Sequence, residues 1–132
     1  LKELLSECDK SQVAGISFGG QMHGLVILDK DDNVIRPAIL WNDGRTTKET
    51  EYLNNVIGKD KLSQYTANIA FAGFTAPKIL WVKENEPENF ARINKYVALS
   101  TYFNYKLTGN LIDSASEYTG HYPLNYKKKQ WL

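Results

Sequence analysis

The chain has 132 residues, of which 42% are hydrophobic and 23% are charged, so a disordered chain is excluded and one compact domain is expected. The 16 basic and 15 acidic side chains leave a net charge of +1, which gives no electrostatic reason to expect binding to nucleic acid or to a membrane surface. A single cysteine, Cys8, excludes an intrachain disulfide.

The lone cysteine and the lack of a zinc-binding pattern predict a reduced, cytoplasmic setting. No apolar run approaches the roughly 18 residues of a membrane helix. The chain begins with Leu1 rather than with methionine, and we interpret it as a segment of something longer.

The first third of the chain is expected to hold one helix end and three strands. LKELLSEC (1–8) spaces its leucines as a helix does, and VAGISFGG (13–20) is small and apolar, as a buried strand is. GLVILD (24–29) and VIRPAILW (34–41), joined by the turn-forming KDDN, predict a β-hairpin. Pro37 predicts that the second hairpin strand lies at an edge or bends.

The pattern then becomes helical. Thr46 or Thr47 is expected to cap a helix through KETEYLNNVIG, which Gly58 ends, and KDKLSQYTAN predicts another short helix. After a break at FAGF, Thr75 is expected to cap APKILWVKENE, and Pro87 lies in the first turn of a further short helix.

The last third of the chain is expected to alternate between strands and a helix. KYVALS (95–100) has the composition of a strand, TYFNYKLTG predicts a helix closed by Gly109, and YPLNYKKKQWL predicts a terminal strand or hairpin with aromatic contacts. Alternating helices and strands indicate the α/β class.

Polar side chains follow two of the apolar runs. Gly19 and Gly20 are followed by Gln21, Met22 and His23, which offer an amide, a flexible apolar wall and an imidazole. By themselves the two glycines indicate only a tight turn, although glycine also permits close approach of the backbone to a ligand.

The second polar group is WNDGR, which runs from Trp41 to Arg45. Trp41 can face the C–H side of a sugar, and Asn42, Asp43 and Arg45 supply an amide, a carboxylate and a guanidinium, the mixture that a polyol needs. The alternative interpretation is a loop in which Asp43 and Gly44 form a turn and Arg45 makes an ion pair.

Four stretches carry a resemblance to a known family: GGQMHGLVILD, RPAILWNDGR, GFTAPKILWVKENEPENF and YKLTG. In this order they resemble the xylulokinases, a branch of the FGGY family of carbohydrate kinases, across residues 10–110. The resemblance implies an actin-like, ribonuclease-H-like ATPase domain of the α/β class, in which a mixed β-sheet is flanked by helices and a partner domain lies across a cleft. Residues 1–132 are then expected to be part of the N-terminal domain of such a kinase.

The resemblance also implies which residues bind substrate. In xylulokinases the Met-His pair contacts the sugar, and the Trp-Asn-Asp-Gly-Arg loop lies beside the same pocket, with the two glycines turning the chain toward it. The substrate-binding residues implied here are Gln21, Met22, His23, Trp41, Asn42, Asp43 and Arg45.

ATP and Mg²⁺ are implied for the full-length kinase, and neither is expected to bind this chain alone. The family's phosphate-binding Asp-x-Gly-Thr hairpin and its catalytic aspartate are both missing from these residues, so no catalytic or metal-binding residue is expected here. The expected partners are a small sugar and the remainder of the kinase, without nucleic acid or membrane; a homodimer is left open.

Two departures from the family pattern leave the identity of the sugar open. Thr101 stands where xylulokinases carry an aspartate, and SASEYTG replaces Ser-Asp-Ala-Ser-Gly-Thr, with Glu117 as the nearest acid. The leading hypothesis is a kinase of a pentulose, D-xylulose above all. The alternatives are an FGGY kinase for another ketose, a polyol or a hexonate, and a sugar-binding module that does no chemistry.

The missing motifs lead to the prediction that the isolated 132-residue chain does not phosphorylate sugar. A coupled assay with ATP and xylulose measures this directly. Sugar-dependent turnover above background, abolished by His23→Ala, would contradict the prediction.

Overall fold

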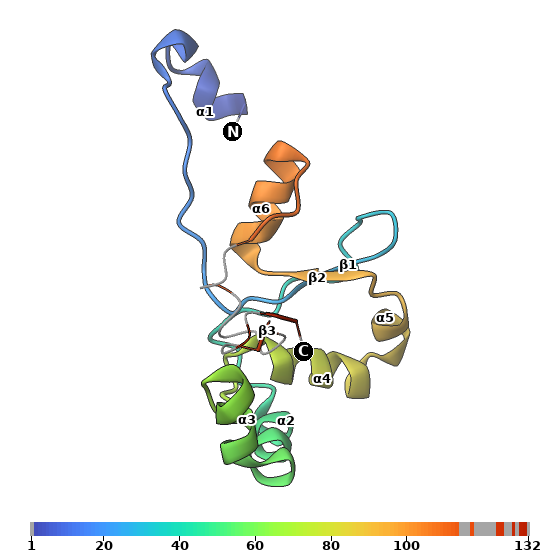
Figure 1. The fold of residues 1–132 in the computed structure, drawn as a ribbon. Helices are drawn as coiled ribbons and strands as arrows, with labels where there is room; N and C mark the ends of the chain where they lie inside the picture. The colour runs from blue at the N-terminus through green and yellow to red at the C-terminus, as the bar shows by residue number, and fades with distance from the viewer. Residues whose placement is uncertain (1, 114–116, 118–123, 126–127, 129, 132) are drawn as a thin grey trace.

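The computed structural model describes residues 2–113 together with residues 117, 124, 125, 128, 130 and 131. Figure 1 shows a small central sheet with helices on both sides, α2 and α3 at one end and an extended segment that leads to α1 at the other. In chain order the elements are α1 (Lys2–Ser6), the 3-10 helix η1 (Lys10–Gln12), β1 (Val26–Leu28), α2 (Thr47–Tyr52), the π-helix η2 (Leu53–Gly58), α3 (Lys59–Thr66), α4 (Thr75–Asn85), α5 (Pro87–Ala91), β2 (Lys95–Val97), α6 (Leu99–Thr108), β3 (Leu124–Asn125) and β4 (Gln130–Trp131).

Strand β1 is buried on both faces. It pairs antiparallel with β2, with Val26 opposite Val97. Leu25 and Ile27 face a cluster that includes Val82 of α4, and the alternate residues of β1 face a second cluster built with α6. The alternation follows from the two-residue repeat of a strand, and burial on both faces explains why GLVILD is apolar throughout.

The predicted hairpin forms, and it bends at Pro37. Leu25 and Ile39 exchange two backbone hydrogen bonds of 2.9 and 3.1 Å, and the Ile35 amide donates to the Ile27 carbonyl at 3.0 Å. Between these two pairs, the first strand has one residue, Val26, and the second has three, residues 36–38. The second strand therefore bulges at Pro37, which has no N–H to donate.

The helical segments follow the prediction with two corrections at their starts. Thr46 and Thr75 make no side-chain capping bond; their hydroxyls donate instead to the carbonyls of Ala72 and His23. Thr75 is the first residue of α4 rather than its cap. The predicted helix ends at Gly58 and Gly109 hold, because both glycines have positive φ, at 97° and 74°.

Residues 13–20 were expected to form a buried strand, and this prediction is wrong for the structure described. The segment has no regular secondary structure and is exposed along its whole length, Phe18 included. A strand needs a neighbour for its N–H and C=O groups, and no strand within the described part of the chain pairs with it. Helix α1 lies at its far end and has no buried residue (Figure 1).

The end of the chain also agrees in outline with its prediction. KYVALS forms a shorter strand than expected, because α6 already begins at Leu99. Strands β3 and β4 pair antiparallel, with Leu124 opposite Trp131, so the terminal hairpin is confirmed. The aromatic contacts expected there fall on side chains outside the described residues.

We predict that Ile27→Ala destabilises the protein by about 2–5 kcal/mol, because Ile27 lies at the centre of the cluster between β1 and α4 and leaves a cavity there. The free energy of unfolding in urea measures the loss. Val56→Ala is the matched control: Val56 is 68% exposed, and its truncation should change the unfolding free energy by less than about 0.5 kcal/mol. Equal losses in the two variants would contradict this description of the core.

Candidate functional site

The segment that carries Gln21, Met22 and His23 turns at the histidine. Neither Gly19 nor Gly20 has a positive φ. His23, by contrast, has φ 61°. Gly20 serves another purpose: a Cβ at this position would lie 2.7 Å from the Ser100 Cβ at the start of α6. The expectation that the glycines make the turn is therefore wrong; Gly20 allows close packing, and the left-handed backbone is that of His23 itself.

The segment that carries Trp41 to Arg45 is fixed by its own ion pair. Arg45 donates Nε to Asp43 Oδ1 at 2.9 Å, and its Nη2 lies 2.8 Å from Oδ2. The guanidinium also stacks over Trp81 of α4, 4.6 Å from the ring centre. The hydrogen bond, the ion-pair contact and the ring contact together leave the guanidinium little freedom.

A third segment, residues 71–75, joins the first two. The buried Thr46 hydroxyl donates to the Ala72 carbonyl at 2.8 Å, and a Cβ on Gly73 would lie 2.5 Å from the Trp41 carbonyl oxygen. The Phe74 ring lies 4.2 Å from the His23 ring, centre to centre. From the sequence alone, this FAGF stretch is expected only to break the helical pattern.

Lys78 of α4 lies where the segments meet. Its side chain is fully buried, and its Nζ donates to the His23 carbonyl at 2.6 Å and to the Gly73 carbonyl at 2.7 Å. Thr75 adds a bond of 3.3 Å to the same His23 carbonyl. A buried ammonium group is tolerated only when its hydrogen bonds are satisfied, and here the two acceptors come from two different segments.

The charges of the site affect one another. Burial lowers the pKa of His23, and the neighbouring Lys78 ammonium lowers it further, so the imidazole is neutral at pH 7. Burial also lowers the pKa of Lys78 to about 8, although the Asp43 carboxylate opposes this. The hydrogen bond from Arg45 is the main reason that the pKa of Asp43 lies below its usual value, so this carboxylate is ionised.

The structure thus brings both predicted groups to one place. His23 and Asp43 are half-buried, and the other members are exposed: Gln21, Met22, Trp41, Asn42 and Arg45. The sequence did not point to Phe74 or Lys78, which contact the ring and the carbonyl of His23. The available signal was a lysine in the otherwise apolar stretch APKILWV, at a position that α4 turns inward.

A comparison with known proteins identifies the family. The family model described as "FGGY family of carbohydrate kinases, N-terminal domain" matches residues 1–132. The chain belongs to the FGGY family of carbohydrate kinases. A xylulose kinase of Staphylococcus xylosus is 44% identical over 99% of this chain and 27% of its own length, and one of Lactococcus lactis is 48% identical over 91% and 24%. The chain thus spans about a quarter of the length of these curated relatives.

Solved structures agree with this assignment. A crystal structure described as a "xyloylose kinase" from Brucella ovis superposes on this chain with a TM-score of 0.83 and 41% identity, covering 91% of this chain and 24% of the other. The expected fold class is confirmed: this FGGY chain is of the α/β class, with the actin-like, ribonuclease-H-like fold of its neighbours.

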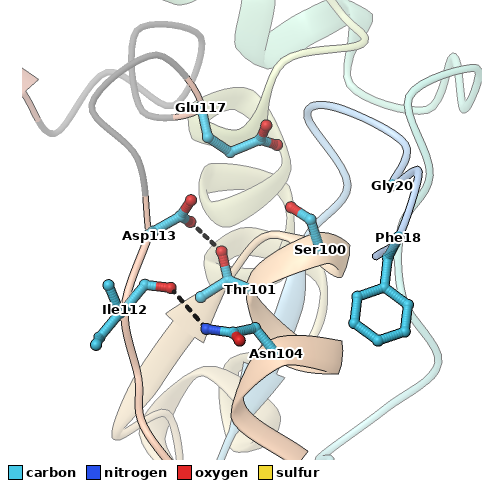
Figure 2. A pocket seen from close by; sticks show the side chains of 8 residues that line it. All are labelled: Phe18, Gly20, Ser100, Thr101, Asn104, Ile112, Asp113 and Glu117. Carbon is cyan, nitrogen blue, oxygen red and sulfur yellow. Dashed lines mark hydrogen bonds between the residues drawn. The ribbon is translucent and has the colours of Figure 1, made fainter. Parts of the chain in front are cut away.

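Thr101 and Glu117, both singled out in the sequence, line one pocket of about 530 Å³ (Figure 2). Thr101, buried in the first turn of α6, donates its hydroxyl to Asp113. Glu117 lies across the pocket, and burial, aided by Asp113, raises the pKa of its carboxyl. Carboxylates thus remain beside the start of α6, carried by residues 113 and 117.

The described residues hold no group of three or more His, Cys, Asp or Glu side chains placed to bind a metal ion. Within the same residues, no helix has both the length and the apolar character needed to cross a bilayer.

We predict that folding stability rises with pH between about 8 and 10. The pKa of Lys78 falls from 10.5 to about 8 on folding, so over this interval the unfolded chain binds a proton that the folded chain does not. Folding raises the pKa values of Tyr105, Lys48 and Lys95, so these groups act in the opposite direction, but only above about pH 10, where they lose protons in the unfolded chain. The urea midpoint should rise across this range in the wild type.

Lys78→Met should remove that rise, and Lys83→Met on the exposed side of the same helix should keep it. An unchanged slope in Lys78→Met would show that another group is responsible.

Proposed function

We propose that the full-length protein transfers the γ-phosphate of ATP to a hydroxyl of a pentulose, D-xylulose, and that this chain supplies part of the sugar site. One observation carries the proposal: the segments around His23 and Asp43 are brought together by a third segment and by Lys78. The two curated relatives, at 44% and 48% identity, are described as xylulose kinases, which supports a pentulose over a hexonate or a polyol.

The side chains then divide into three roles. His23, neutral at pH 7, can both donate and accept a hydrogen bond with sugar hydroxyls, and Gln21 and Asn42 add amides beside it. Asp43 presents a carboxylate that Arg45 holds in one orientation, so Asp43 contacts the sugar and Arg45 positions it.

The third role is apolar. Trp41 and Met22 are 55% and 61% exposed, and they offer surface for the C–H face of the sugar. The competing interpretation, in which Asp43 and Arg45 only close a loop, explains their pairing equally well but leaves the exposed Trp41 beside them without a purpose.

The nucleotide belongs to other parts of the protein in this proposal. ATP with a divalent metal, Mg²⁺ in our proposal, supplies the phosphoryl group, and phosphoryl transfer depends on placing phosphates, metal and acceptor together. In this proposal the residues of this chain bind the sugar, orient its hydroxyls and limit water around them. The remainder of the kinase is the obligatory partner. A cytoplasmic location and a homodimer remain proposals.

The test is a coupled assay of the full-length protein with ATP and D-xylulose, with gluconate and glycerol as competing acceptors. We expect xylulose to give the highest kcat/KM. His23→Ala should raise the KM for the sugar about 2–13-fold, the equivalent of one hydrogen bond of roughly 0.5–1.5 kcal/mol, and leave the KM for ATP unchanged.

Gln64→Ala, an exposed change on α3, is the control and should leave both constants unchanged. A higher KM for ATP with an unaltered KM for sugar in His23→Ala would overturn the assignment of His23. Absence of phosphorylation with any acceptor, combined with retained sugar binding, would favour a binding module over a kinase.

A further inference from the structure

Lys78 makes contacts that a lysine rarely makes. Its side chain is fully buried, and its ammonium group donates to two main-chain carbonyls, those of His23 and Gly73. The two acceptors lie 55 and 5 residues away along the chain. The described structure shows no carboxylate in a salt bridge with it. Its hydrogen bonds are therefore made entirely to the backbone of the candidate sugar site.

The residue that Lys78 holds has an unusual backbone. His23 has φ 61°, a left-handed conformation that is uncommon for residues other than glycine and that persists only where the surroundings enforce it. Lys78 and Thr75 both donate to the carbonyl of this residue, at 2.6 and 3.3 Å. These two hydrogen bonds constrain the peptide plane that follows His23 and so limit rotation of the backbone at this residue.

The hydrogen bond from Lys78 to the Gly73 carbonyl links the lysine to the segment that carries Trp41 to Arg45. Gly73, whose carbonyl accepts from Lys78, packs directly against the Trp41 carbonyl, where a Cβ would lie only 2.5 Å away. There is thus no room for a side chain between Gly73 and the Trp41 carbonyl. One ammonium group therefore connects the segment from Gln21 to His23 (the histidine segment) with a residue packed against the segment from Trp41 to Arg45 (the tryptophan segment).

We propose that Lys78 is a positioning residue of the sugar site: through the His23 and Gly73 carbonyls it sets the orientation of the His23 imidazole toward the pentulose. The proposal rests on the proposed function. Lys78 does not touch the substrate; it acts through His23 and is not a catalytic residue.

The charged and titratable groups around Lys78 are few. His23 precedes β1, and Asp43 lies in the segment after the hairpin; both interact electrostatically with the ammonium. Within α4 the next lysine, Lys83, lies in the last turn and is exposed.

A double-mutant cycle in the full-length enzyme tests the proposal. Lys78→Met keeps the length of the side chain and removes the donors, so we expect the KM for D-xylulose to rise about 3–10-fold while the KM for ATP stays constant. In a His23→Ala background the same change should have a clearly smaller effect, because the imidazole that Lys78 orients is gone and only the contact through Gly73 remains. Lys83→Met, the matched control on the same helix, should change neither constant.

Fully additive effects of Lys78→Met and His23→Ala would overturn the proposal, since they would show that Lys78 acts elsewhere. If Lys78→Met does not fold, Thr75→Val decides in its place, because it removes the other side-chain donor to the His23 carbonyl. Thr75→Val should raise the KM for sugar in the wild type and not in His23→Ala. Additive effects of these two changes would also overturn the proposal.

A second measurement separates this proposal from the proposed function. NMR titration of ring-labelled histidine, with His23 assigned from His23→Gln, should show a higher pKa for His23 in Lys78→Met than in the wild type, because the ammonium that lowers it is gone. Lys83→Met should leave this pKa unchanged. Failure of the protein to phosphorylate any pentulose would refute the function, while the titration would still report whether Lys78 governs His23. An unchanged His23 pKa in Lys78→Met would refute the Lys78 proposal alone.

Discussion

The hydrogen bonds between the Lys78 ammonium and the carbonyls of His23 and Gly73 hold the candidate site together. Removing a cation from water is costly, so a buried lysine is retained only where its donors are satisfied. Here the acceptors belong to segments with no regular secondary structure, which could not hold their positions by a helix or sheet ladder. For these segments, hydrogen bonds from the lysine side chain take the place of the backbone hydrogen bonds that hold helices and strands.

The precision of this contact depends on the scaffold behind it. Strand β1 is buried between α4 on one face and α6 on the other, so its ends have little freedom. The histidine segment enters at the start of β1, and the tryptophan segment leaves the hairpin strand beside it. Lys78 projects from α4, which packs on the same strand. Polar side chains on irregular segments are thereby positioned by a rigid core, as binding sites commonly require.

The ion pair of Asp43 and Arg45 illustrates how one geometry serves two purposes. Two hydrogen bonds and an ion-pair contact from Arg45 to Asp43 close the segment, as a structural loop would require. The same bonds keep the Asp43 carboxylate ionised and in one orientation, as a sugar site would require. Stacking of Arg45 over Trp81 connects the pair to α4, the helix that carries Lys78. Both the histidine segment and the tryptophan segment thus contact side chains of α4.

Local sequence determined the hairpin, its bend at Pro37, the helices from residue 47 onward and the helix ends at Gly58 and Gly109, because each depends on periodicity or on the dihedral preferences of a single residue. The resemblance of four motifs determined the family and the candidate site residues.

The tertiary structure decided the rest. The apolar pattern of residues 13–20 could not reveal that no described strand would pair with them. Thr46 and Thr75 matched the capping pattern, but their hydroxyls found carbonyls in other segments. The role of Lys78 was invisible in the sequence, because it depends on two carbonyl groups that only folding brings within reach of its ammonium.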